Sequence, residues 1–122
     1  MIQTILLVED SLTDAYYVRN ILECNGFSIL HAMNAEDALS ILESNNIDLI
    51  LMDIVLPTNS GFALVRYLSK NQKFAHIPVV VCSHKSQESD KIWALKQGAV
   101  DYLVKPVSEH LLLSKITNLY VC

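Results

Sequence analysis

The chain lacks the features that mark membrane-spanning, secreted and nucleic-acid-binding proteins. No apolar stretch in its 122 residues approaches the roughly 20 needed to cross a bilayer. The first residues have no basic start of the kind that opens a signal peptide. Lys and Arg number 9 against 13 Asp and Glu, and they form no run that could neutralise a row of phosphates. We therefore expect no membrane insertion and no direct nucleic-acid partner.

Cysteine is also scarce. Cys24, Cys82 and Cys122 are odd in number, no two have CxxC spacing, and Cys82 lies in an apolar run. This usage predicts a reducing compartment, the cytoplasm. Linkers, repeats and low-complexity stretches are absent, and 52% of the residues are hydrophobic. Residues 1–122 are therefore expected to form one domain with its own core.

What the sequence does contain is a regular alternation. Short apolar runs rich in β-formers alternate with segments of helical period, which predicts five strand–helix units and a parallel sheet covered on both faces. The expected strands are Thr4 to Val8, Phe27 to His31, Asp48 to Met52, Val79 to Cys82 and Asp101 to Val104. The third and fourth are almost continuously apolar, so we place them deepest.

Capping residues locate the helices between these strands. The expected N-terminal positions are Ser11, with Asp14 at the third helical position, Asn34, Gly61, Ser86 and about Val107. The expected ends are Gly26, Asn45-Asn46, Gln97 before Gly98, and Tyr120. The last helix holds Leu111, Leu112 and Leu113, more apolar residues than one buried stripe requires, which suggests a dimer or partner surface.

Polar residues follow four of the apolar strands. Glu9 and Asp10 follow the first strand and Asp53 follows the third. Chemistry in open parallel sheets collects at the carboxyl ends of strands. Three carboxylates brought together there call for a cation, and their oxygen ligands suit Mg²⁺. The alternative is that Glu9-Asp10 only caps the following helix.

The other two strand ends carry Ser83 and Lys105-Pro106. A fixed Lys105 ammonium would offset the carboxylates and hold a phosphoryl oxygen, and the Ser83 hydroxyl could donate to the same group. Taken singly, Lys105 could be a solvated strand-end lysine and Ser83 an ordinary turn residue.

The ordered set of these motifs resembles the receiver domain of bacterial two-component response regulators, the CheY-like family. The resemblance covers essentially the whole chain. It rests on residues 5–10, Asp53-Ile54-Val55-Leu56-Pro57, Gly61-Phe62, Ile77-Pro78-Val79, Gly98-Ala99 and Tyr102-Leu103-Val104-Lys105-Pro106. It implies a flavodoxin-like (βα)5 doubly wound parallel sheet with strand order 2-1-3-4-5.

The resemblance also implies roles for single residues. Asp53 would accept a phosphoryl group from a sensor histidine kinase or phosphotransfer protein. Glu9, Asp10, Asp53 and the backbone carbonyl of Val55 would hold Mg²⁺. Lys105, joined to Pro106 by a cis peptide, would contact the phosphoryl group.

A switch is implied as well. Ser83 would move toward the phosphoryl group and Tyr102 would then move inward, changing the face formed by the fourth helix, last strand and last helix. That face would bind a downstream protein target. Taken without the family, an aromatic on a strand such as Tyr102 is simple packing.

Two features bear on the lifetime of the phosphorylated state and on the signalling pathway to which the protein belongs. His84 follows Ser83 where receivers usually carry a small residue, and it could crowd the site. The segment from Asp90 through Trp93 to Ala99 is similar to stand-alone receivers of the twitching-pilus and phototaxis type, although Trp93 could simply cover helix surface. With no effector domain after the last helix, output is expected by protein contact. A piece of a longer protein would look the same.

Two other classes of function stay open. A pseudo-receiver that binds partners without phosphorylation usually loses Asp53, one of the acidic pair or Lys105, and this chain keeps them all. A phosphohydrolase of the haloacid-dehalogenase type needs a second Asp two residues after the nucleophile, where Val55 stands. We expect no enzyme beyond self-phosphorylation and self-dephosphorylation, and a monomer or weak homodimer.

Overall fold

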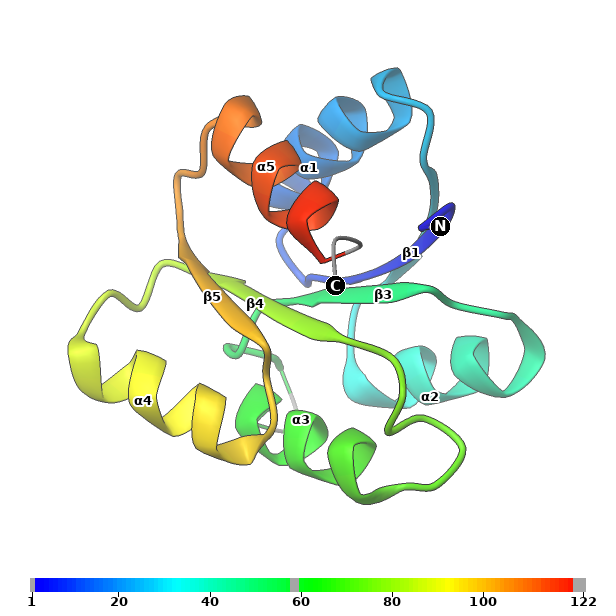
Figure 1. The fold of residues 1–122 in the computed structure, drawn as a ribbon, viewed down its shortest axis with the longest axis vertical. Coiled ribbons are helices and arrows are strands. Elements are labelled where there is room, and N and C mark those ends of the chain that lie inside the picture. The colour runs from blue at the N-terminus through cyan, green and yellow to red at the C-terminus, as the bar shows by residue number, and fades with distance from the viewer. Residues whose placement is uncertain (1, 58–59, 120–122) are drawn as a thin grey trace.

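The computed structural model describes residues 2–57 and 60–119, in which five parallel strands alternate with five helices. The strands form one sheet in the order β2-β1-β3-β4-β5 (Figure 1). This confirms the expected flavodoxin-like fold and its strand order. The elements are β1 Thr4–Val8, α1 Leu12–Cys24, β2 Ser28–Ala32, α2 Ala35–Ser44, β3 Leu49–Met52, α3 Gly61–Lys70, β4 Val79–Ser83, α4 Glu88–Gln97, β5 Asp101–Val104 and α5 Glu109–Asn118.

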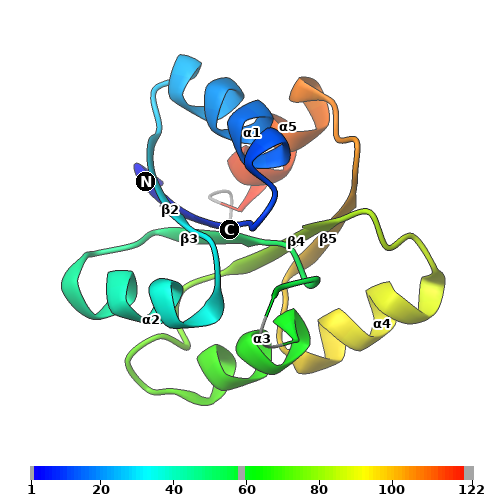
Figure 2. The same ribbon diagram turned by 180° about the vertical axis from the view of Figure 1, so that it is seen from behind.

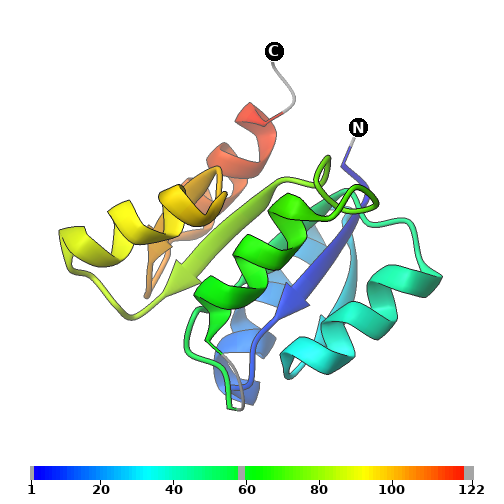
Figure 3. The same ribbon diagram turned by 90° about the horizontal axis from the view of Figure 1, so that it is seen from below.

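The sheet separates two helical layers. Helices α1 and α5 cover one face, and α2, α3 and α4 cover the other (Figures 1 and 2). Seen from below, α3 lies between α4 and α2 (Figure 3). Each layer has its own apolar core against the sheet, one around Leu22 and Leu112 and the other around Val65 and Leu68. Every residue of β3 and β4 is buried, which confirms that these two strands lie deepest.

Two strands end one residue later than predicted, and β2 also begins one residue later. β2 covers Ser28–Ala32 because it pairs in register with β1, Thr4 opposite Ser28 and Val8 opposite Ala32. β4 includes Ser83, which pairs with Val104. Ser83 is thus the last residue of a central strand rather than the first of a loop, and its side chain is buried.

The start of α4 was predicted wrongly. Ser86 is not its cap: the helix begins at Glu88, and Gln87 occupies the N-cap position without a side-chain hydrogen bond. Two hydrogen bonds fix the backbone of Lys85, which precedes the helix. Its N–H donates to Ser83 Oγ at 3.3 Å, and its carbonyl accepts from the Tyr102 hydroxyl at 2.7 Å. These bonds keep the backbone out of a helix until Gln87.

The bounds of α5 also differ from the prediction. The helix begins at Glu109, because Ser108 Oγ accepts from the Leu111 N–H, and Val107 is a buried residue of the preceding loop. The predicted end at Tyr120 lies outside the described residues. Of the three consecutive leucines, Leu112 is buried and Leu113 packs partly against the core. Only Leu111, 40% exposed, is left for the proposed partner surface.

Within residues 2–57 and 60–119, no helix combines the length and the hydrophobicity that a membrane crossing requires.

Gly61 fixes the loop that follows β3. Its N–H donates to the Ile54 carbonyl at 2.9 Å, and a Cβ on this residue would lie 2.9 Å from the Asp53 carbonyl oxygen and closer still to Ile54 Cα. Only glycine therefore allows the start of α3 to approach the backbone beside Asp53 so closely.

We expect Gly61→Ala to lower the free energy of unfolding by about 1–3 kcal/mol, because the added methyl group overpacks backbone that cannot move away. Urea unfolding followed by circular dichroism measures the change. Arg66→Ala, on the exposed side of the same helix, is the control. Equal midpoints for the two variants would show that the loop yields to a side chain.

Candidate functional site

The carboxyl edge of the sheet brings four of the predicted residues together. Val8 pairs with Met52, so Glu9 and Asp53 are the next residues on adjacent strands. The Asp53 N–H donates to the Val8 carbonyl at 3.0 Å, which extends the pairing by one step. The next two strands, β4 and β5, end in the same way, because the Lys105 N–H donates to the Ser83 carbonyl at 2.8 Å. The ends of four parallel strands thus deliver these side chains to one edge.

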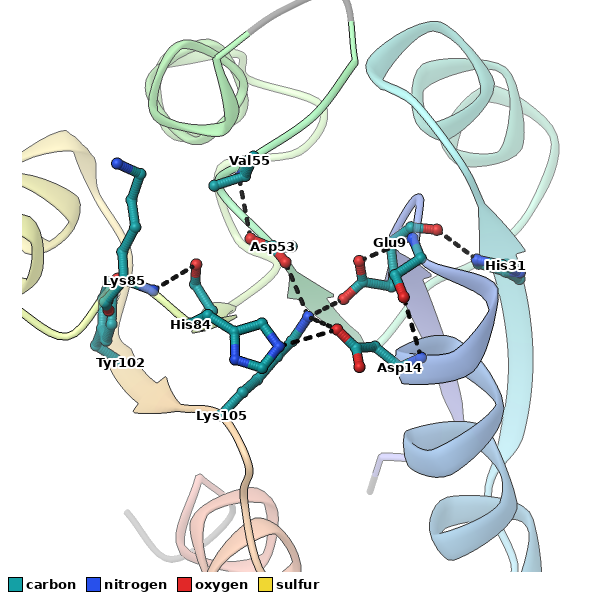
Figure 4. Close-up of polar contacts among 11 residues, drawn as sticks. Glu9, Asp14, His31, Asp53, Val55, His84, Lys85, Tyr102 and Lys105 are labelled. Atoms are coloured by element: carbon teal, nitrogen blue, oxygen red, sulfur yellow. Dashed lines mark hydrogen bonds and ion pairs between the residues drawn. The ribbon is translucent and has the colours of Figure 1, made fainter.

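The Lys105 ammonium is at the centre of the site (Figure 4). Its Nζ donates to Asp53 Oδ2 at 2.8 Å, to Asp14 Oδ2 at 2.9 Å and, in a short contact, to Glu9 Oε1. The side chains of Lys105, Glu9 and Asp53 are all less than 10% exposed. Lys105 is joined to Pro106 by a cis peptide, as the resemblance implied.

Burial and charge oppose each other in this cluster. Burial disfavours the charged form of Lys105, but the hydrogen bonds to Asp53, Glu9 and Asp14 outweigh it and raise the pKa of the ammonium. Burial raises the pKa of Glu9, despite its hydrogen bond to Lys105. The hydrogen bond from Lys105 lowers the pKa of Asp14. At neutral pH Lys105 therefore carries a full positive charge.

Asp53 is held in one orientation. Its Oδ1 accepts from the Val55 N–H at 2.9 Å, while Oδ2 accepts from Lys105. The opening toward this carboxylate is a hollow of about 380 Å³. It is lined by Glu9, Asp10, Ser11, Asp14, Asp53, Val55, Ser83, His84 and Lys85. A small anionic group could reach Asp53 through this hollow.

The donors predicted for Mg²⁺ all line the same hollow. Glu9, Asp10, Asp53 and Val55 offer only oxygen ligands, which suits this ion. Asp10 is exposed and has no ion pair with another described residue. Among the described residues, no three acidic, His or Cys side chains are arranged around a common metal position. The donor chemistry fits Mg²⁺, and here the Glu9 and Asp53 carboxylates face an ammonium.

Asp14 is the site residue that the sequence analysis missed. We assigned it only to the helix dipole, whereas it faces Lys105 from the first turn of α1. The same Oδ2 lies 3.3 Å from His84 Nε2. The sequence offered one signal, which is the spacing between Asp10 and Asp14. Asp14 follows four residues later, about one helical turn, so its carboxylate can still face the strand ends.

Ser83 and Tyr102 form a connected unit beside this cluster. The Ser83 Oγ accepts from the Lys85 N–H, and the Tyr102 hydroxyl donates to the Lys85 carbonyl. Burial raises the pKa of Tyr102, so its hydroxyl stays protonated and able to donate. Tyr102 is only 9% exposed and thus already lies inward.

Comparison with known proteins shows the family of this chain. The family model described as "Response regulator receiver domain" matches residues 5–117. The chain belongs to the response regulator receiver family. Protein PilH of Pseudomonas aeruginosa is 43% identical to this receiver over 112 residues, which cover 92% of this chain and 93% of PilH.

Solved structures of receivers are also similar. The receiver domain of a signal transduction histidine kinase from Syntrophus aciditrophicus has a TM-score of 0.88 at 34% identity, covering 96% of this chain and 89% of that one. The receiver domain of a sensor histidine kinase from Pseudomonas aeruginosa has a TM-score of 0.87 at 25% identity, covering 97% of each chain. That structure has a magnesium ion coordinated in its active site cleft.

We expect Lys105→Met to lower the free energy of unfolding by about 3 kcal/mol near neutral pH, because it leaves buried carboxylates without their counter-charge. The pKa of Glu9 is higher in the folded protein than its ordinary value. Its contribution to the stability of the fold therefore falls as the pH rises from the ordinary value to the folded-state value. Loss of the ammonium raises the Glu9 pKa further, so the deficit shrinks as pH falls toward 4.5, the ordinary value.

Urea unfolding at several pH values measures this dependence. Lys115→Met is the matched control, because Lys115 pairs with Asp101 at 3.1 Å on the surface. Its loss should cost less than about 1 kcal/mol at any of these pH values. A deficit for Lys105→Met that does not change with pH would contradict the part assigned to Glu9.

Proposed function

We propose that this receiver accepts a phosphoryl group on Asp53 from a phosphohistidine of a sensor histidine kinase or phosphotransfer protein. The single observation that carries the proposal is the Asp53 carboxylate, fixed by the Val55 N–H and Lys105 at the end of a hollow open to solvent. An Asp53 oxygen attacks the phosphorus, the P–N bond breaks, and the electron pair leaves with the imidazole nitrogen. Aspartate is an established covalent nucleophile for phosphoryl groups.

The surrounding residues would position the reactants and offset charge, which is most of what phosphoryl transfer requires. Lys105, kept protonated by its carboxylate neighbours, would donate to a phosphoryl oxygen. Glu9, Asp10, Asp53 and the Val55 carbonyl would hold Mg²⁺. When bound, that ion supplies positive charge against the phosphoryl oxygens. The magnesium ion in the related Pseudomonas aeruginosa receiver supports this assignment.

The signal would leave through the unit formed by Ser83, Lys85 and Tyr102. A phosphoryl group on Asp53 adds charge and acceptor oxygens, which would draw the Ser83 hydroxyl and favour the inward Tyr102 that the Lys85 carbonyl holds. The altered surface around α4, β5 and α5 would then bind a protein target. Apart from these reactions on itself, we expect no enzymatic turnover, and we place the protein in the cytoplasm as a monomer or weak homodimer.

The alternative is a pseudo-receiver that binds its partners without phosphorylation. The geometry favours the phosphoacceptor, because Asp53 and Lys105 lie in contact beside an accessible hollow. The similarity to PilH over nearly the whole of both chains supports a receiver of the twitching-pilus type.

Incubation with acetyl phosphate and Mg²⁺ should add one phosphoryl group, because Asp53 is oriented and accessible. Intact mass spectrometry measures the increment. Asp53→Asn, which keeps the size of the side chain, and removal of Mg²⁺ with a chelator should each abolish it. A wild-type protein that binds Mg²⁺ but takes no phosphoryl group from acetyl phosphate or from a phosphohistidine protein would favour the pseudo-receiver.

Tyr102→Phe should still be phosphorylated but should transmit less of the change, because it loses the hydrogen bond to the Lys85 carbonyl. Amide shifts in α4 and at Lys85, recorded by NMR before and after phosphorylation, are expected to be smaller than in the wild type. Tyr67→Phe, on the exposed face of α3, is the control. Shifts of wild-type size in Tyr102→Phe would remove Tyr102 from the switch.

A further inference from the structure

Asp14 is a carboxylate in the site that the proposed chemistry does not use. It lies on the first turn of α1, and its Oδ2 accepts from Lys105 Nζ at 2.9 Å (Figure 4). Lysine has three N–H donors, and three carboxylates take all of them here: Glu9, Asp14 and Asp53. For Lys105 to donate to a phosphoryl oxygen, one of these contacts has to open.

The three carboxylates are not equally easy to release. The side chain of Glu9 is 4% exposed, and its second oxygen accepts from the Ser11 N–H at 3.1 Å. The side chain of Asp53 is 8% exposed and is the acceptor itself. The side chain of Asp14 is 30% exposed, so water can replace Lys105 as its partner at the smallest cost. Asp14 is therefore the partner that Lys105 can give up.

The position of Asp14 also places negative charge beside the path of an anionic donor. It lines the hollow that leads to Asp53, and His84 contacts its Oδ2 from the loop after β4. Like charges in a partly desolvated cleft repel one another more strongly than in bulk water. A phosphoryl group that enters this hollow would therefore meet the negative charge of Asp14 as well as a Lys105 ammonium that Asp14 already binds.

We propose that Asp14 is a positioning residue that competes with the phosphoryl group for the Lys105 ammonium, and so limits how readily Asp53 is phosphorylated. This inference rests on the proposed function of Asp53. The same negative charge strengthens the attraction of the cluster for a divalent cation. Removing it should therefore have opposite effects on phosphorylation and on Mg²⁺ binding.

Asp14→Asn keeps the shape of the side chain and removes its charge. At low acetyl phosphate and saturating Mg²⁺, it should be phosphorylated about three- to tenfold faster than the wild type, the range expected for loss of a partly exposed ionic contact. Its dissociation constant for Mg²⁺, from calorimetric titration, should rise. Asp14→Glu, which keeps the charge, should stay close to the wild type in both measurements.

The matched control is Asp37→Asn. Asp37 is also the third residue of its helix, and its N–H donates to the capping residue Asn34, as the Asp14 N–H does to Ser11. It lacks any contact with the site, so its change should alter neither rate nor Mg²⁺ affinity. Damage to the fold would lower both the rate and the affinity, and could not produce opposite changes. An unchanged or slower rate for Asp14→Asn would overturn the inference.

A third measurement separates this inference from the proposed function. The NMR signal of the Lys105 Cε group should shift in Asp14→Asn and not in Asp37→Asn, with no phosphodonor present. If Lys105 shifts but the wild type is never phosphorylated, the proposed function fails and takes the inference with it. If the wild type is phosphorylated and Lys105 does not shift, only the inference fails.

Discussion

The site depends on one ammonium group surrounded by three carboxylates. Lys105 offsets a single negative charge of the three that contact it, so the cluster stays negative even with every donor satisfied. Burial disfavours the charged form of Glu9, so its pKa is raised although it bonds to Lys105. The two apolar cores on either side of the sheet fix the strands from whose ends these charged side chains project. A site of this kind responds strongly to any added cation or anion, which is what a phosphorylation switch requires.

Much of this site follows from the sequence because parallel strands end at one edge. Once the apolar runs before Glu9, Asp53 and Lys105 are recognised as strands, their convergence needs no knowledge of side-chain conformation. Asp14 is different, since its contact with Lys105 joins residues 91 apart and depends on where the first turn of α1 lies relative to the residue that follows β5. Helical spacing shows which turn Asp14 occupies, but not which residue on another element meets it.

The helix boundaries show the same difference between what local sequence determines and what distant contacts determine. Local side-chain chemistry predicts the caps at Ser11 and Asn34, and the structure has both. The same chemistry would allow the cap at Ser108. Ser86 is as good a cap by local rules, yet α4 begins later, because Tyr102 and Ser83 hold the Lys85 backbone. The position of that helix start is set by a contact across the sheet. Such contacts, made by residues distant in the sequence, account for most of what the residue pattern could not supply.

That contact also joins the charged cluster to the surface. Lys85 is bonded to Ser83 through its N–H and to Tyr102 through its carbonyl, so one residue connects the hydroxyl beside Asp53 to the aromatic ring of β5. Because coupling between two sites is reciprocal, whatever favours the inward Tyr102 also favours the Ser83 position compatible with it. If phosphorylation of Asp53 strengthened the binding of a target protein, the bound target would in turn stabilise the phosphorylated form. The two effects would have the same free energy. Tyr102 already lies inward here, so under the proposed function phosphorylation would stabilise a conformation that the receiver can already adopt rather than create a new one.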